Sequence, residues 1–150
     1  MTTIHRRAPA CALAAALAVA GCGGGDELGK AELAKKADAI CIKYTKQAEN
    51  LGQPDLSDPK KAEGYFNKAK DLAQKQQDEL TDLTPASDVK ADYSKLTKAS
   101  QGATDLLGDL AKAAGDQDKK KATELAQKLE PLSADVKSAA NSIGADSCAT

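Results

Sequence analysis

The amino-acid sequence predicts an all-α protein, an antiparallel up-down-up-down four-helix bundle on a flexible N-terminal tether. Over four segments, apolar and small residues recur at alternating steps of three and four, which is the spacing of a helix that buries one stripe. Proline, glycine and aspartate mark short turns between these segments, and short turns join antiparallel neighbours. No stretch alternates with the two-residue period of a strand.

The first helix is predicted over residues 29–50 and the second over residues 59–83. Gly52 is expected to cap the first helix at its C-terminus. Asp58 and Pro59 supply an N-cap and a proline at the first position of the second helix. The predicted stripe of the first helix is Ala34, Ala37, Cys41, Tyr44 and Ala48, flanked by Leu33 and Ile40. That of the second is Ala62, Tyr65, Phe66, Ala69, Leu72, Ala73, Gln76, Leu80 and Leu83.

The third helix is predicted over residues 86–114. Thr84 and Pro85 repeat the combination of cap and proline before it, and Gly115 ends it. It has the most regular stripe of the four, namely Val89, Tyr93, Leu96, Ser100, Ala103, Leu107, Leu110 and Ala114.

The fourth helix is expected to begin after Asp116 or Asp118 and to end at Gly144. Its stripe is Ala122, Leu125, Leu129, Leu132, Val136, Ala139 and Ile143. Pro131 lies inside this helix and is expected to kink it. If one of the proline-marked breaks were a kink rather than a turn, a three-helix bundle would result. The mature segment, residues 22–150, has 129 residues, which is enough for one domain and too few for two. Residues 29–150 are assigned to the bundle domain.

Residues 1–21 have the three parts of a secretory signal peptide. His5, Arg6 and Arg7 give a positive start, and small residues suitable for cleavage follow the apolar segment Ala10–Ala20. That segment has 11 residues, whereas a membrane-spanning helix needs about 20. The segment therefore predicts export rather than a span.

The sequence Val19-Ala20-Gly21-Cys22 resembles the lipobox of bacterial lipoproteins. The resemblance implies that a diacylglycerol is attached to the Cys22 thiol and that cleavage before Cys22 makes it the first residue of the mature protein. The alternative is ordinary secretion, with cleavage after Ala20 and a free thiol at Cys22.

Residues 22–28 are predicted to be a lipidated cysteine and a tether, because Gly23, Gly24 and Gly25 form a flexible linker. Two or three acyl chains anchor a protein stably, so the chain is expected on the extracytoplasmic face of a bacterial membrane. Since residue 23 is not aspartate, the resemblance favours the outer membrane in a double-membrane bacterium. In a single-membrane bacterium it implies the outer face of the plasma membrane.

The number of cysteines supports lipidation. Without the leader, Cys22, Cys41 and Cys148 remain, an odd number for an oxidising compartment. If Cys22 bears lipid, Cys41 and Cys148 can form a disulfide. The five-residue tail after Gly144 would have to run nearly extended along the first helix to reach Cys41. Two buried free thiols are the alternative.

The composition of the mature chain excludes several functions. It has 19 lysines, no arginine and 22 acidic residues, a net charge of −3, which disfavours nucleic-acid binding. The single histidine, His5, lies in the predicted signal peptide and is removed with it. The mature chain therefore has no histidine for a catalytic triad, a haem attachment or a di-iron site. We therefore expect no enzyme, no metal and no cofactor apart from the lipid.

One surface is a candidate for binding a partner. Five lysines gather at the two turns farthest from the anchor, where the second and fourth helices begin: Lys60, Lys61, Lys119, Lys120 and Lys121. This lysine apex could contact an envelope protein or an anionic polymer of the cell wall. The alternative is a solvated cap, because aspartates in the same turns offset most of its charge.

The aromatic side chains are expected mainly in the core, with Tyr44 beside Tyr65 and with Tyr93 bonded to the Gln76 amide. A pocket for a small apolar ligand between the helices, lined by these aromatic rings, is the alternative. Ala37-Asp38-Ala39-Ile40-Cys41, Leu80–Pro85 and a cysteine near the C-terminus also resemble small helical actinobacterial lipoproteins of unassigned function. The sequence thus predicts a membrane-anchored, non-catalytic bundle that binds a partner or structures the envelope, or alternatively a carrier or sensor of a small apolar ligand.

Overall fold

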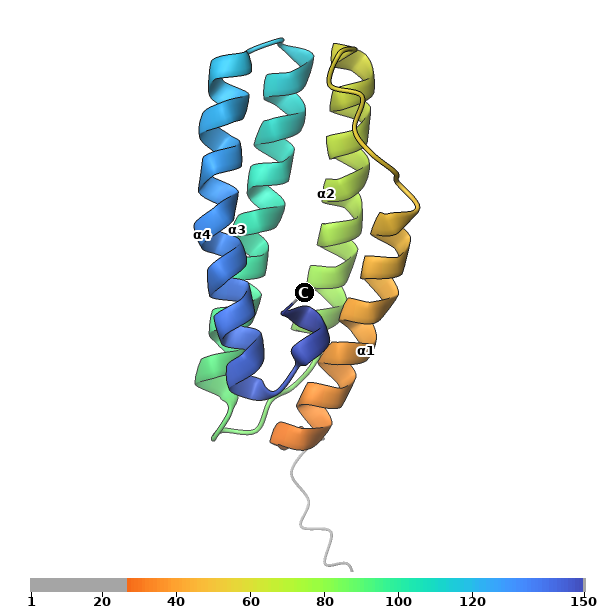
Figure 1. The fold of residues 1–150 in the computed structure, drawn as a ribbon. Coiled ribbons are helices and arrows are strands. Elements are labelled where there is room, and N and C mark those ends of the chain that lie inside the picture. The colour runs from red at the N-terminus through yellow and green to blue at the C-terminus, as the bar shows by residue number, and fades with distance from the viewer. Residues whose placement is uncertain (1–26, 150) are drawn as a thin grey trace, which may run out of the picture.

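The computed structural model describes residues 27–149 and confirms the predicted four-helix bundle (Figure 1). Its helices run alternately up and down, and a short 3-10 helix follows them. The elements are α1 (Lys30–Glu49), α2 (Pro59–Thr81), α3 (Lys90–Gly115), α4 (Lys119–Ile143) and η1 (Asp146–Cys148). Within the described residues the only β-type pairing is an isolated bridge between Leu28 and Pro85.

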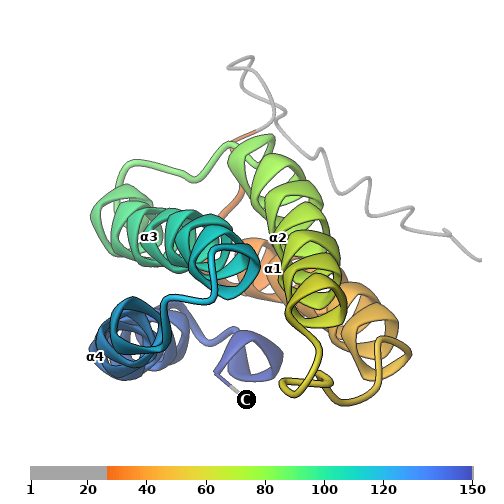
Figure 2. The same cartoon turned by 90° about the horizontal axis from the view of Figure 1, so that it is seen from above.

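The four helices form an arc rather than a closed square. α3 packs closely on α2 along one side and on α4 along the other, and α1 packs on α2. α1 and α4 have little contact with each other, and η1 lies between them (Figure 2). The C-terminal tail therefore closes the lower part of the arc.

Three of the predicted helix ends are confirmed. The Asp58 carboxylate accepts hydrogen bonds from the backbone N–H groups of Lys60 and Lys61, and Pro59 takes the first helical position. Asp118 caps α4, where its carboxylate accepts a hydrogen bond from the backbone N–H of Lys121. Gly144 ends α4 with a φ of 82°, a left-handed conformation that glycine adopts without strain.

The start of α3 differs from the prediction, because residues 82–89 form a loop instead of a tight turn. Leu28 lies against this loop, where its N–H donates to the Thr84 carbonyl (2.7 Å) and its carbonyl accepts from the Ala86 N–H (2.9 Å). α3 begins only at Lys90, with Val89 at its N-cap position, so Thr84 caps no helix. Leu28, assigned from sequence to the tether, is 5% exposed and belongs to the core.

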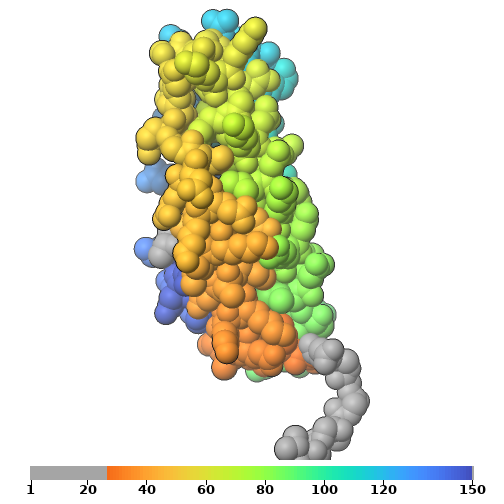
Figure 3. All heavy atoms as spheres, turned by 90° about the vertical axis from the view of Figure 1, so that its right-hand side faces the viewer, coloured from red at the N-terminus to blue at the C-terminus, as the bar shows by residue number. Residues whose placement is uncertain are grey.

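The position of α1 along the bundle also differs. Residues 50–58 do not make a tight turn but climb beside α2, so that α1 covers only the lower part of that side (Figure 3). Tyr44 consequently reaches Glu79 near the lower end of α2. The predicted pairing of Tyr44 with Tyr65 is therefore wrong, and the Tyr65 ring instead meets the edge of Phe66 at 5.5 Å.

The buried side chains form two clusters of unequal size. The lower cluster consists of Leu28, Leu33, Ala37, Cys41, Leu80, Val89, Tyr93, Leu96, Ala139, Ala140, Ile143, Ala145 and Cys148. The upper cluster consists of Leu110, Ala113 and Leu125. Both lie between residues 28 and 148, so a chain that begins at residue 22 keeps the whole core.

Candidate functional site

Cys41 of α1 and Cys148 of η1 form a disulfide, with their Cα atoms 5.2 Å apart. Both residues are at least nine-tenths buried. The pairing predicted from the count of cysteines is therefore the one present. It joins residues 107 positions apart and fixes the C-terminal tail to the first helix.

The tail reaches Cys41 without being extended, contrary to the prediction. α4 ends beside the second turn of α1, since a Cβ added to Gly144 would lie 3.8 Å from that of Ala34. Farther along the tail, the Ser147 N–H donates to the Asp38 carboxylate at 2.7 Å. A single 3-10 turn then brings Cys148 to Cys41. The tail has only about two turns of α1 to climb, which a compact segment can span.

Asp38 and Gln76 support the disulfide through contacts that the sequence did not predict. The Asp38 carboxylate accepts a hydrogen bond from the backbone N–H of the residue before Cys148. The Gln76 amide donates to the Cys41 sulfur at 3.3 Å. The predicted bond between Tyr93 and Gln76 is absent, because the Tyr93 hydroxyl donates to the Leu80 carbonyl instead.

We expect Tyr93 to make the protein sensitive to alkaline pH. Its side chain is 4% exposed, and burial raises the pKa of its hydroxyl far above the ordinary value of about 10. Above about pH 10 the unfolded chain loses this proton and the folded chain keeps it, so stability falls as pH rises. Urea unfolding between neutral pH and about pH 11 should show this loss, and Tyr93→Phe should reduce it. An equal loss in the variant would contradict this account.

A smaller charged cluster joins α1 to α2. The Lys43 ammonium and the Tyr44 hydroxyl (2.8 Å) both donate to the Glu79 carboxylate, and these bonds hold the pKa of Glu79 below its ordinary value. Burial and the bond to Glu79 raise the pKa of Tyr44. Lys43 and Glu79 are solvent-accessible, so the cluster orients α1 rather than forming a reactive site.

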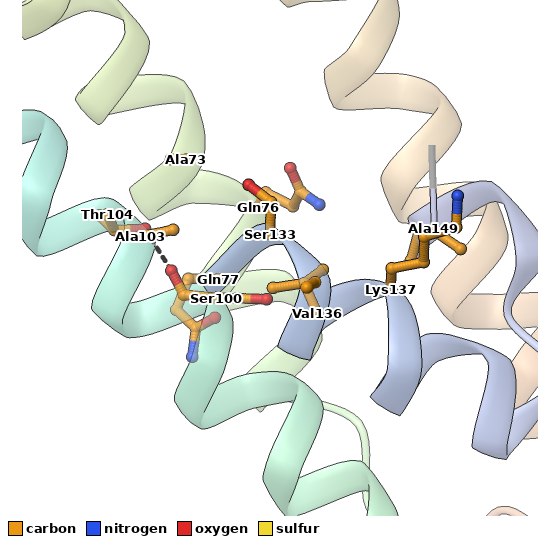
Figure 4. A pocket seen from close by; sticks show the side chains of 12 residues that line it. Ala73, Gln76, Gln77, Ser100, Ala103, Thr104, Ser133, Val136, Lys137 and Ala149 are labelled. Carbon is orange, nitrogen blue, oxygen red and sulfur yellow. Dashed lines mark hydrogen bonds between the residues drawn. The ribbon is translucent and has the colours of Figure 1, made fainter. Parts of the chain in front are cut away.

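A groove with a volume of about 390 Å³ lies above η1, between α2 and α4, with α3 as its floor (Figure 4). It is open to solvent along one side. Small side chains line most of it, which leaves the space unfilled. The lining residues are Ala73, Gln76, Gln77, Ser100, Ala103, Thr104, Ser133, Ala134, Val136, Lys137, Cys148 and Ala149.

Gln77 is the most unusual residue of this groove. It is 7% exposed, and its amide nitrogen donates to the Thr97 carbonyl at 3.0 Å. Its Oε1 atom is buried and has no hydrogen-bond partner among the described residues. Rotating the amide would set two oxygens against each other, so the contact with Thr97 fixes the orientation. A buried acceptor without a partner costs about 1–3 kcal/mol.

The sequence contains a signal for the burial of Gln77, although the predicted stripe of α2 does not include this residue. Steps of four and three lead from Ala73 through Gln77 to Leu80, which is the same periodicity that marks a buried face. Gln76 was assigned to the stripe instead. It is half buried at the edge of the groove.

The five apex lysines lie at one end of the bundle, at the first turns of α2 and α4 (Figure 1), and all are exposed. Lys61 pairs with Asp55 at 3.1 Å. The hydroxyl of Ser57, with Lys61, lowers the pKa of Asp55 to about 2. Because Asp58 and Asp118 already occupy N–H groups of the two helix ends, an anionic partner would meet lysine side chains there. Binding at this apex stays a prediction.

Among the described residues 27–149, no three or more histidine, cysteine, aspartate or glutamate side chains are grouped so that they could hold a metal ion. None of the helices in this range combines the length and apolar character that crossing a membrane requires. Cys22 lies outside this range, as do the predicted signal peptide and the glycines of the tether.

The chain was also compared with known proteins. No protein family, curated protein or solved structure matches it.

Proposed function

We propose that this chain is a lipid-anchored protein of the extracytoplasmic face of a bacterial membrane, where its helical bundle binds a partner without catalysing a reaction. The disulfide between Cys41 and Cys148 carries the proposal. Structural disulfides persist in oxidising compartments outside the cytoplasm. This bond uses two of the three cysteines that follow the leader, and it leaves Cys22 for the lipid.

The proposal also sets the distance of the bundle from the membrane. Leu28 docks at the lower end of the bundle, and six residues after Cys22 span at most about 20 Å. The base of the bundle would therefore stay within about 20 Å of the anchor. α3 has 26 residues and a length of about 39 Å, so the lysine apex would face away from the membrane, toward wall polymers or envelope proteins.

The mass and the lipid content of the exported protein test this proposal. The full chain is produced in a bacterial host that processes lipoproteins and is supplied with an alkyne-bearing palmitate analogue. We expect a labelled product that begins at Cys22 and sediments with membranes, and complete loss of the label in Cys22→Ala. The variant Cys41→Ala/Cys148→Ala should keep the label. An unlabelled product that begins at Gly21 would establish ordinary secretion instead.

The groove favours a second candidate function, that of a carrier or sensor of a small ligand. The space between α2 and α4 is open to solvent rather than enclosed, and it has mainly small apolar walls. The groove has an open side, so exchange of a ligand would not require the helices to separate.

A further inference from the structure

We propose that the lysine apex binds an extended polyanion, a flexible polymer that bears a phosphate or another anionic group on each repeating unit. This rests on the proposed function, because it names the class of partner for the end of the bundle that would face away from the membrane. Lipid labelling tests the anchor, and titration of the lipid-free bundle tests the apex, so each can fail separately.

Four of the five apex lysines have no anionic partner in the part of the chain that the structure describes. Lys61 is paired with the Asp55 carboxylate at 3.1 Å. The remaining four are exposed and form no ion pair with any residue from 27 to 149. These unpaired lysines are Lys60, Lys119, Lys120 and Lys121. Their charges are therefore available to an anion from outside.

The other aspartates of the two turns are already engaged. Asp58 accepts hydrogen bonds from backbone N–H groups at the start of α2, and Asp118 accepts one from the Lys121 N–H at 2.9 Å. Asp116 pairs with Lys112 at 2.6 Å. These bonds hold the carboxylates on the backbone or on other lysines, so the ammonium groups of the unpaired lysines stay exposed to solvent.

The unpaired lysines form two separate groups, which favours a polymer over a single small anion. Lys60 lies in the first turn of α2, and the other three begin α4. The end of α3 lies between them (Figure 2), and no Cα atom of α2 is within 8 Å of one of α4. A chain of regularly spaced anionic groups can contact both groups at once, whereas one small anion would meet only one of them.

The opposite end of the bundle would not attract such a polymer. It exposes Asp82, Asp88 and Asp146, none of which forms an ion pair within the described range. α3 runs from one end to the other over about 39 Å, whereas salt at about 0.15 M screens exposed charges over about 8 Å. The acidic base therefore does not cancel the attraction at the apex, and binding is expected at the apex alone.

The chemistry of the apex suits a polyanion better than a protein surface. The cores of protein interfaces are enriched in aromatic residues, methionine and arginine and depleted in lysine. The mature chain has no arginine and no tryptophan, and the one large apolar side chain exposed near the apex in the described residues is Leu56. Lysine is a flexible point charge, which can follow a polymer that has no fixed shape.

End-labelled inorganic polyphosphate tests the proposal. Its fluorescence anisotropy is titrated with residues 22–150 carrying Cys22→Ser, folded in an oxidising compartment, a chain that keeps the whole core. Four lysine contacts should make the affinity fall about a hundredfold between about 50 and about 200 mM salt. Orthophosphate at the same total phosphate concentration should not displace the polymer, because it cannot contact both groups of lysines.

Two quadruple variants with the same change in net charge localise the binding. Replacing the four unpaired lysines by glutamine should weaken binding at least about tenfold and remove most of its salt dependence. The matched control replaces four exposed lysines of the lower half that also form no ion pair within residues 27–149, and it should bind like the parent chain. These are Lys35, Lys75, Lys90 and Lys98. Leu56→Ala should also leave the affinity unchanged.

Several outcomes would overturn the proposal. If the parent chain did not bind polyphosphate, a polyanion would be excluded and a protein would remain as the partner of the apex. An equal loss in the two quadruple variants would show that only net charge matters. Displacement by orthophosphate would indicate a site for single anions, and a loss in Leu56→Ala as large as that in the apex variant would indicate an apolar contact. If the apex variant did not fold by circular dichroism, the salt dependence and the competition in the parent chain would still decide.

Discussion

Replacing both Cys41 and Cys148 by alanine is expected to lower the free energy of unfolding by about 4 kcal/mol. The disulfide joins residues 107 positions apart, and the chain-entropy estimate for a loop of about 100 residues is about 4.7 kcal/mol. Without the disulfide, Ala145 and residue 148 of the tail would also be held less firmly in the core. Urea unfolding of the variant beside the oxidised parent measures the difference.

Reduction provides an independent measurement of the same quantity. The parent chain in excess thiol should unfold at nearly the same urea concentration as the double alanine variant. Cys22→Ser should leave the midpoint unchanged, because all buried core residues of the described chain lie after it. A loss below about 1 kcal/mol in both the variant and the reduced parent would show that packing of the tail alone holds it in place.

The tail also illustrates how far the sequence could predict this fold. The count of cysteines predicted the right pair, because parity is independent of geometry. The path between them was predicted wrongly, since the fourth helix was assumed to end level with the start of the first. The contact of Gly144 with Ala34 shows that it ends one turn higher, and that offset depends on tertiary packing.

The helices themselves were predictable because each buries one stripe, but their registers were not. Residues 50–58 run up beside α2, so α1 lies lower along the bundle than a tight turn would place it. Tyr44 therefore donates a hydrogen bond to Glu79 and does not stack on Tyr65. Propensity gives no signal for such a shift, since an exposed linker and a tight turn share similar polar residues. Docking of Leu28 on the loop that precedes α3 is likewise a long-range contact.

The position of the groove was not predicted. The alternative pocket was expected to be lined by the aromatic rings, and none of them lines the groove. The reason lies in α3. This helix contacts α2 on one side and α4 on the other. It therefore buries Ala99, Thr104 and Ala113 in addition to members of the predicted stripe. A single stripe describes a helix with one neighbouring surface, so it could not show that small residues would leave space between α2 and α4.

The unequal clusters of the core predict where the bundle is most sensitive to truncation. Leu80 is fully buried in the large lower cluster, and its carbonyl accepts a hydrogen bond from the Tyr93 hydroxyl. We expect Leu80→Ala to lower the free energy of unfolding by about 3–4 kcal/mol, from lost burial and the cavity that remains. Leu56→Ala is the matched control, because Leu56 is 69% exposed and should change stability by less than about 0.5 kcal/mol.

The same truncation in the upper cluster separates the two halves of the bundle. Leu125 is 2% exposed, but only Leu110 and Ala113 share its cluster as buried residues. The side chains packed around this cluster are only partly buried and can close around a missing side chain, so we expect Leu125→Ala to cost about 2 kcal/mol. Urea unfolding followed by circular dichroism ranks the three variants. If Leu125→Ala lowered the free energy of unfolding more than Leu80→Ala, the upper cluster would be the main source of stability. The expected order instead makes the disulfide-linked base the more stable half of the bundle, and the helices of the upper half can then adjust their packing.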